Sequence, residues 1–123
     1  MQATNLKNKD LLEYREIERW LTGSPYSTKA NYLSSLKKYL IYRDMNPEKL
    51  IDEIEADRKK SKREQGEVEL EAKKFLEWLR TDREKETGGY NPRKTGEKGM
   101  SDKAVASILG AIRSFYRANG FTL

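Results

Sequence analysis

The side chains of this 123-residue chain that can do chemistry are amines, guanidinium groups, hydroxyls and carboxylates, because the sequence contains neither cysteine nor histidine. A chain without cysteine has no thiolate nucleophile, disulfide or cysteine-ligated metal, which fits a reducing compartment. Without histidine it has no Ser-His-Asp triad and no imidazole ligand. No paired-carboxylate or phosphate-loop spacing is present. We therefore expect a protein that binds rather than catalyses, with no metal and no cofactor.

The positive charge of the sequence is concentrated in two segments. The chain has 25 Lys and Arg against 20 Asp and Glu, a net charge of +5. Residues 22–43 hold four basic residues and residues 103–123 hold three, and neither segment contains an acid. Residues 44–86, by contrast, hold 14 acids and 11 bases. In a chain this rich in Asp and Glu, two acid-free segments favour contact with a polyanion.

Two helices are expected to carry these acid-free segments. Placing Leu33, Leu36 and Leu40 inward on a helix over 27–44 leaves an outward side of small, basic or aromatic residues. The same construction on a helix over 101–119 leaves small and basic residues outward. The two outward sides are Asn31, Ser34, Ser35, Lys38 and Tyr42 on the first helix, and Lys103, Ser107, Gly110 and Ser114 on the second.

Small, acid-free, hydroxyl-bearing sides suit a helix that approaches a phosphate backbone or enters a major groove about 12 Å wide. The alternatives are that these sides are merely exposed, or that their small residues admit a neighbouring helix. Tyr39 and Tyr42 could stack on bases, although tyrosines at helical spacing more often lie at the edge of a core. The expected DNA contacts are Thr28, Lys29, Asn31, Ser35, Lys38, Lys103, Ser107 and Arg113, with Lys29 and Arg113 nearer the edge.

The hydrophobic periodicity of the whole chain predicts an all-α fold, a small bundle of four to five helices. We expect a single domain over 1–123 with a core from about 9 to 121. The remaining helices are expected over 9–21 and within 47–86, the latter broken near Gln65-Gly66 because glycine weakens a helix interior.

Local signals predict where the helices begin and end. Ser27, Asn46 and Ser101 are expected N-caps, with Pro47 at a first helical position. Gly120 is expected to end the last helix. The N-termini at Ser27 and Ser101 also offer backbone N–H groups suited to a phosphate.

Two other basic stretches are less informative. The run Arg58 to Arg63 is hemmed in by acids and is predicted to be a solvated face. A flexible basic loop is expected over about 87–100, where Arg93, Lys94 and Lys98, beside Tyr90, could reach a phosphate, although charges in a loop are usually just solvated.

The helix patterns resemble the core-binding domain of tyrosine recombinases, the phage integrase family. Ser27-Thr28 followed by Tyr32, Leu36, Tyr39 and Leu40 is similar to that domain's second helix. Ser101 to Gly120, with Ile108-Leu109 and Ile112 to Tyr116, is similar to its last helix, and Ile17 to Leu21 fits the first. The resemblance covers about residues 12–121 and departs between Glu55 and Met100, where this chain is longer.

This resemblance implies a SAM-like helical bundle that clamps one side of a recombination-site duplex. A separate C-terminal domain of such proteins cuts and rejoins the strands with Arg, Lys, His-x-x-Arg and a nucleophilic Tyr, a set that a chain without histidine cannot contain. The implied function is therefore non-catalytic DNA binding for integration or recombination. The implied partners are double-stranded DNA, the catalytic domain of the same protein and other recombinase protomers. The rival interpretation is a helical protein–protein interaction module without nucleic-acid binding.

No apolar run approaches the roughly 20 residues that span a bilayer. The first 21 residues carry four acids and four bases, which is unlike a signal or transit peptide. We expect a soluble, cytoplasmic protein without a membrane partner.

Overall fold

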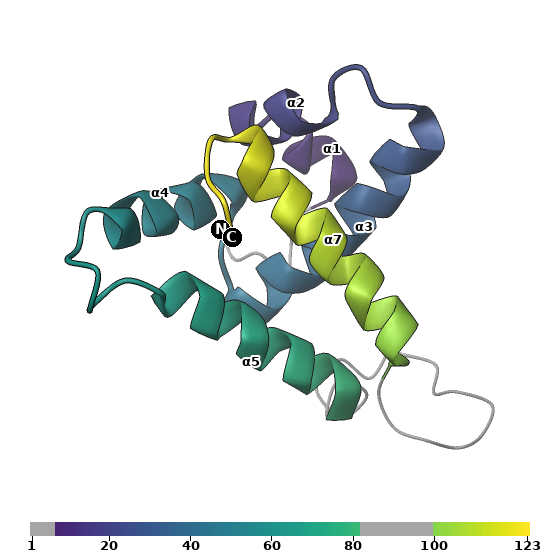
Figure 1. Cartoon of the computed structure of the whole chain (residues 1–123). Coiled ribbons are helices and arrows are strands. Elements are labelled where there is room, and N and C mark those ends of the chain that lie inside the picture. Colours follow the sequence, from purple (N-terminus) through teal and green to yellow (C-terminus); the bar gives the residue numbers. More distant parts are fainter. Residues whose placement is uncertain (1–6, 82–99) are drawn as a thin grey trace.

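The computed structural model describes residues 7–81 and 100–123, and these residues form helices and no strand. The all-α prediction is therefore confirmed. In Figure 1, α7 crosses α3, and it also packs against α2 and α5, so that it is the central helix of the bundle. The helices of the described residues are α1 (Asn8–Leu11), α2 (Arg15–Leu21), α3 (Tyr26–Arg43), α4 (Pro47–Arg58), α5 (Glu67–Thr81) and α7 (Asp102–Ala118).

The first expected helix, over 9–21, is divided into α1 and α2. Tyr14 has extended backbone angles and stands as the N-cap of α2. On one continuous helix Leu11 and Ile17 would point about 120° apart. The break turns Leu11 inward, and both side chains are fully buried. Leu12, which lies at the break, stays half exposed.

The start of α3 differs from the prediction. The helix begins at Tyr26, with Pro25 in the N-cap position and no side-chain cap, so Ser27 lies inside the first turn. The cause is local: proline holds φ near −60° and has no N–H to leave unpaired, so the chain enters a helix directly after it.

The other predicted boundaries are confirmed. Asn46 Oδ1 accepts a hydrogen bond from Lys49 N at 2.9 Å, with Pro47 at the first position of α4. Ser101 Oγ accepts from Ala104 N at 3.2 Å. Gly66, with φ +110°, separates α4 from α5. Gly120, with φ +94°, follows the C-cap of α7.

A buried carboxylate holds the turn between α4 and α5. Asp57 is only 2% exposed, and its oxygens accept from Gly66 N at 3.1 Å, Glu67 N at 3.3 Å and Arg58 Nη1 at 2.6 Å. Burial alone would raise the pKa of this carboxyl, but the three hydrogen bonds outweigh it and lower the pKa. Asp57 thus caps α5 from the end of α4.

Arg58 extends this link to the end of the chain. Its guanidinium contacts Glu69 of α5 and donates to the Thr122 carbonyl at 2.9 Å. We call the group Asp57, Arg58, Gly66, Glu67 and Glu69 the α4–α5 corner. Beyond Arg58, the predicted solvated character of the basic run is confirmed, because residues 59–63 are exposed.

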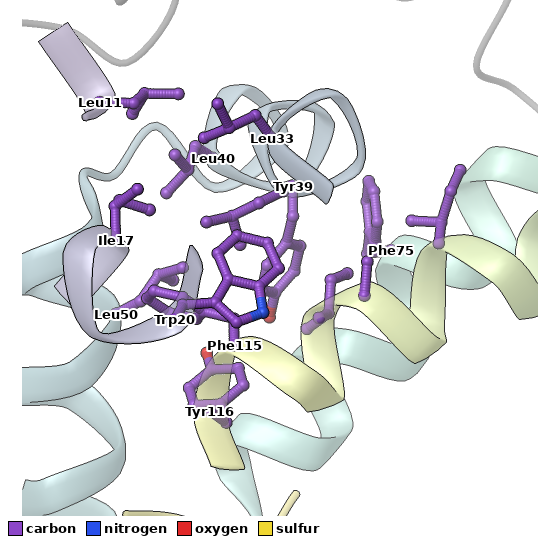
Figure 2. Packing of buried hydrophobic residues seen from close by; sticks show 14 of the residues in the cluster. Leu11, Ile17, Trp20, Leu33, Tyr39, Leu40, Leu50, Phe75, Phe115 and Tyr116 are labelled. Atoms are coloured by element: carbon purple, nitrogen blue, oxygen red, sulfur yellow. The ribbon is translucent and has the colours of Figure 1, made fainter. Parts of the chain in front are cut away.

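The core lies where α2, α3 and α7 meet. Figure 2 shows Trp20, Phe115 and Tyr116 gathered with leucines of α3. The Trp20 ring stacks on Tyr32 with centroids 5.2 Å apart and meets Phe115 edge-on at 5.3 Å. The leucine stripe of α3 is buried as predicted. No helix among the described residues has the length and apolarity needed to cross a bilayer.

Candidate functional site

The polar sides singled out on α3 and α7 belong to two helices in direct contact. Leu36 and Leu40 on α3 and Ile108 and Ile112 on α7 are buried, and the two helices pack against each other. On each helix the polar side chains lie on the side turned away from the buried residues. We call the group of Thr28, Asn31, Ser35, Lys38, Lys103 and Ser107 the α3–α7 face.

On the α3 half of the face the side chains range from exposed to half-buried. Asn31 is exposed, whereas Thr28, Ser35 and Lys38 are half-buried. Lys38 folds back along its own helix, and its Nζ lies 3.1 Å from Ser34 Oγ and 3.4 Å from the Ser34 carbonyl. This half of the face therefore presents one amine and several short polar groups on a rigid helix.

On the α7 half, Lys103, Ser107 and Gly110 are exposed. Lys103 forms no ion pair with any Asp or Glu of the two described segments. A Cβ built on Gly110 would meet nothing within 4 Å. Packing within the described residues thus does not require a glycine at this position.

Ser114 does not belong to the outward side of α7, contrary to expectation. Its Oγ accepts a hydrogen bond from Trp20 Nε1 at 2.9 Å, and the residue is half-buried. An indole N–H that is drawn into a core needs an acceptor, and the serine supplies it. Ser114 therefore contributes to the packing of α2 against α7.

Two predicted DNA contacts lie away from the α3–α7 face. Lys29 is half-buried one turn before Leu33, on the stripe that buries the leucines of α3. Arg113 is exposed on the side of α7 that faces α5, where it borders a groove with Leu76 and Leu109. The helical wheel placed Arg113 near the edge because it does not include the position of α5. As DNA contacts, both remain predictions.

Tyr39 and Tyr42 of α3 pack within the protein. Tyr39 is fully buried and accepts a hydrogen bond from Arg43 at 2.9 Å. Tyr42, expected on the outward side, instead contacts Phe75 and Trp78 of α5, with centroids 5.2 and 5.0 Å away. Tyr42 therefore lies at the edge of the core and its outward placement is wrong, while Tyr39 lies inside the core.

One of the four bases of the segment 22–43 is also taken up by the fold. The Arg43 side chain is 9% exposed and pairs with Glu53 of α4. Burial would lower the pKa of Arg43, but hydrogen bonds with Glu53 and Tyr39 outweigh it and raise the pKa. For the nearby Tyr116 hydroxyl, which is neutral when protonated, burial raises the pKa. The charge that α3 offers to a partner therefore comes from its lysines.

The two helix N-termini differ in what they leave for an anion. The hydroxyl of Ser101 already accepts the Ala104 N–H, and Asp102, paired with Arg80 at 3.2 Å, places a carboxylate at the first residue of α7. The first turn of α3 has neither a side-chain cap nor an acid. Tyr26, which sequence reasoning left out, is 87% exposed there. The signal that would have found it is Pro25, which starts the helix one residue before Ser27.

Comparison of the chain with protein-family models, with curated proteins and with solved structures finds no match. Among the described residues, no three Asp or Glu side chains are grouped so as to hold a metal ion. The loop contacts considered for Tyr90, Arg93, Lys94 and Lys98 lie outside the described residues.

Proposed function

We propose that this chain is a non-catalytic, all-helical DNA-binding domain that clamps a duplex with the α3–α7 face. The observation that carries the proposal is the contact between α3 and α7, because it holds two helices with acid-poor outward sides in a fixed arrangement. α3 contains no Asp or Glu, and in α7 the only acid is Asp102 at the start. A duplex lying along such a face meets cations and hydroxyls with little repulsion.

The residues of the face have distinct roles in this proposal. Lys38 and Lys103 neutralise phosphates, one from each helix. Asn31, Ser35, Ser107 and Thr28 hydrogen-bond phosphate oxygens or base edges. The exposed Gly110 lets a sugar-phosphate strand approach the α7 backbone closely.

The proposal takes its setting from the resemblance to the core-binding domain of tyrosine recombinases, which implies DNA integration or recombination. In that setting the chain is the binding part of a larger recombinase, and the strand chemistry belongs to a C-terminal catalytic domain. Its further partners are the other protomers assembled on the same recombination site. The proposal places the protein in the cytoplasm, with no membrane partner and no cofactor.

The salt dependence of duplex binding tests this proposal. If Lys38, Lys103 and the two other predicted cationic contacts, Lys29 and Arg113, each neutralise one phosphate, log K against log salt concentration falls with a slope near −3.6, and non-specific affinity lies around 10⁻⁴ to 10⁻⁶ M. Fluorescence anisotropy of a labelled duplex between about 50 and 200 mM salt measures both quantities. A flat salt profile, or no binding at the low-salt end, contradicts the proposal.

A matched pair of charge-reversal variants locates the binding surface. Lys38→Glu with Lys103→Glu changes the face, and Lys60→Glu with Lys62→Glu changes exposed lysines after α4. Both variants lower the net charge from +5 to +1, so a difference between them reflects position rather than overall charge. We expect the face variant to lose binding and the control to keep most of it. Equal binding by the face variant and the parent overturns the assignment.

The rival function, a helical protein-interaction module, is favoured by the apolar groove between α5 and α7. The salt dependence of the binding affinity again distinguishes the two functions. An interface of ordinary apolar character does not lose orders of magnitude in affinity over this salt range, whereas duplex binding does.

A further inference from the structure

A groove of about 220 Å³ lies between α5 and α7, away from the α3–α7 face. Its apolar lining consists of Ala72 and Leu76 from α5, Leu109 from α7, and Leu123. The size suits an aliphatic side chain.

Ion pairs and hydrogen bonds tie the two helices together on either side of this groove. Arg80 of α5 pairs with Asp102 of α7 at 3.2 Å. Toward the other end, Arg58 joins Glu69 to the Thr122 carbonyl. These links join α5 to the start of α7 and to the residues that follow α7.

The rim of the groove is cationic. Lys73 and Arg113 border it, and neither forms an ion pair with a carboxylate of the described segments. The one acid of the lining, Glu69, is engaged by Arg58. An occupant that carries an aliphatic side chain beside a carboxylate therefore complements both the lining and the rim.

The same chain presents such a group on another part of its surface. Leu12 is 51% exposed at the break between α1 and α2, and the adjacent Glu13 is exposed as well. Residues 10–18 hold four acids and one base. Of the three large apolar side chains exposed in the described residues, Leu12 is next to Glu13, which forms no ion pair with a base of these residues, and Tyr26 lies in a first turn without acids. Leu70 is flanked by Glu69 and Glu71, but these two carboxylates already pair with Arg58 and Lys74.

We propose that the α5–α7 groove receives Leu12 of a second copy of this chain, with Glu13 of that copy beside Arg113 and Lys73. The contact is head-to-tail, because Leu12 and the groove lie on different surfaces of one molecule. It does not depend on DNA binding. A contact centred on one leucine buries much less than the ~1,200 Å² of a stable interface, so it is weak in free solution. Two copies held side by side on one duplex, as the proposed function provides, would strengthen it through their effective concentration.

Disulfide trapping tests the contact without DNA, and the natural absence of cysteine makes the test clean. Arg15→Cys, an exposed position three residues after Leu12, keeps Leu12 and Glu13 and is mixed with Lys73→Cys under mild oxidation; the heterodimer is followed on a non-reducing gel. The control is the same pair with Leu12→Ala in the Arg15→Cys partner, which leaves both cysteines in place and removes the side chain that fills the groove. We expect the pair with Leu12 to form at least about tenfold faster than the control, the ratio for 1.4 kcal/mol of association free energy. Equal or slower formation overturns the proposal.

Charge exchange then tests the orientation. Glu13→Arg in the Arg15→Cys partner should slow trapping several-fold, and Arg113→Glu in the Lys73→Cys partner should do the same. Combining the two changed partners should restore the rate, because the pair is opposite in charge again. Far-ultraviolet circular dichroism confirms that each variant is folded. Rates that fall additively, without restoration, contradict the proposed placement of Glu13. Because no duplex is present, these outcomes are independent of whether the chain binds DNA.

Discussion

The α3–α7 face and the α4–α5 corner both contain basic residues, but the fold uses them differently. In the corner, the Arg58 guanidinium contacts Asp57, Glu69 and the Thr122 carbonyl, so its hydrogen-bonding capacity is spent inside the protein. On the face, Lys38 contacts a serine of its own helix, and Lys103 has no ion pair within the described segments. We expect a basic residue to contact a polyanion where its helix holds few acids.

The comparison also separates stability from binding. Changes in the corner should alter the free energy of unfolding and leave binding intact, whereas changes on the face should do the reverse.

The largest expected effect is that of Asp57→Ala. The substitution removes the acceptor of the Gly66 and Glu67 N–H groups and one partner of Arg58. We expect the free energy of unfolding to fall by about 2 kcal/mol, the upper range for loss of a helix cap. Urea denaturation followed by circular dichroism measures it. At temperatures where the variant is folded, the salt slope of duplex binding should equal that of the parent. A changed salt slope would show that the α4–α5 corner also contributes to duplex binding.

The ionised form of Asp57 gives this contribution a defined pH range. Its pKa is lower in the folded protein than its ordinary value of 3.8. The stabilisation is therefore fully present above about pH 4 and is lost as the pH falls below that value through the folded pKa. Asp57→Asn should differ from the parent in stability at pH 7 and approach it under acid. A difference that persists unchanged at about pH 2 would contradict a role for the ionised carboxylate.

The next effect in size concerns the face. Lys38→Ala with Lys103→Ala should weaken duplex binding and make the salt slope shallower by about 1.8, because each lost phosphate contact contributes about 0.9. The free energy of unfolding should stay within about 0.5 kcal/mol of the parent value, since both are surface positions. Anisotropy titration and urea denaturation check the two statements. An unchanged slope would show that these amines do not contact phosphates.

Local sequence signals predicted much of this fold. Asn46-Pro47, Ser101, Gly66 and Gly120 act through backbone groups within a few residues of themselves, so the sequence around each is sufficient to interpret it. The buried stripes of α3 and α7 follow from periodicity alone for the same reason.

What the sequence did not predict depends on which helices meet. Ser114 points to Trp20, 94 positions away along the chain. Arg43 pairs with Glu53 across a turn, and Tyr42 packs on α5. A helical wheel shows that a residue faces away from one stripe, but it cannot show whether another helix covers it. The same limit applied to Lys29 and Arg113, whose surroundings are set by tertiary packing.

The smallest expected effect is at Gly110, where a substitution distinguishes a role in helix stability from a role in DNA contact. Gly110 lies inside α7, and a Cβ there meets nothing within 4 Å. Gly110→Ala should therefore raise the free energy of unfolding by about 0.5–1 kcal/mol through helix propensity alone. The matched control is Gly120→Ala, the same chemical change at φ +94°, which should destabilise by about 1 kcal/mol.

If a strand of duplex approaches α7 at Gly110, the stabilised variant should also bind DNA more weakly, because the added methyl group keeps the phosphate backbone away. If the Gly110→Ala variant is more stable but binds DNA more weakly, the glycine serves contact with the duplex rather than folding. A variant that is more stable and binds as well as the parent would place the duplex elsewhere on the α3–α7 face, nearer Asn31 and Ser35.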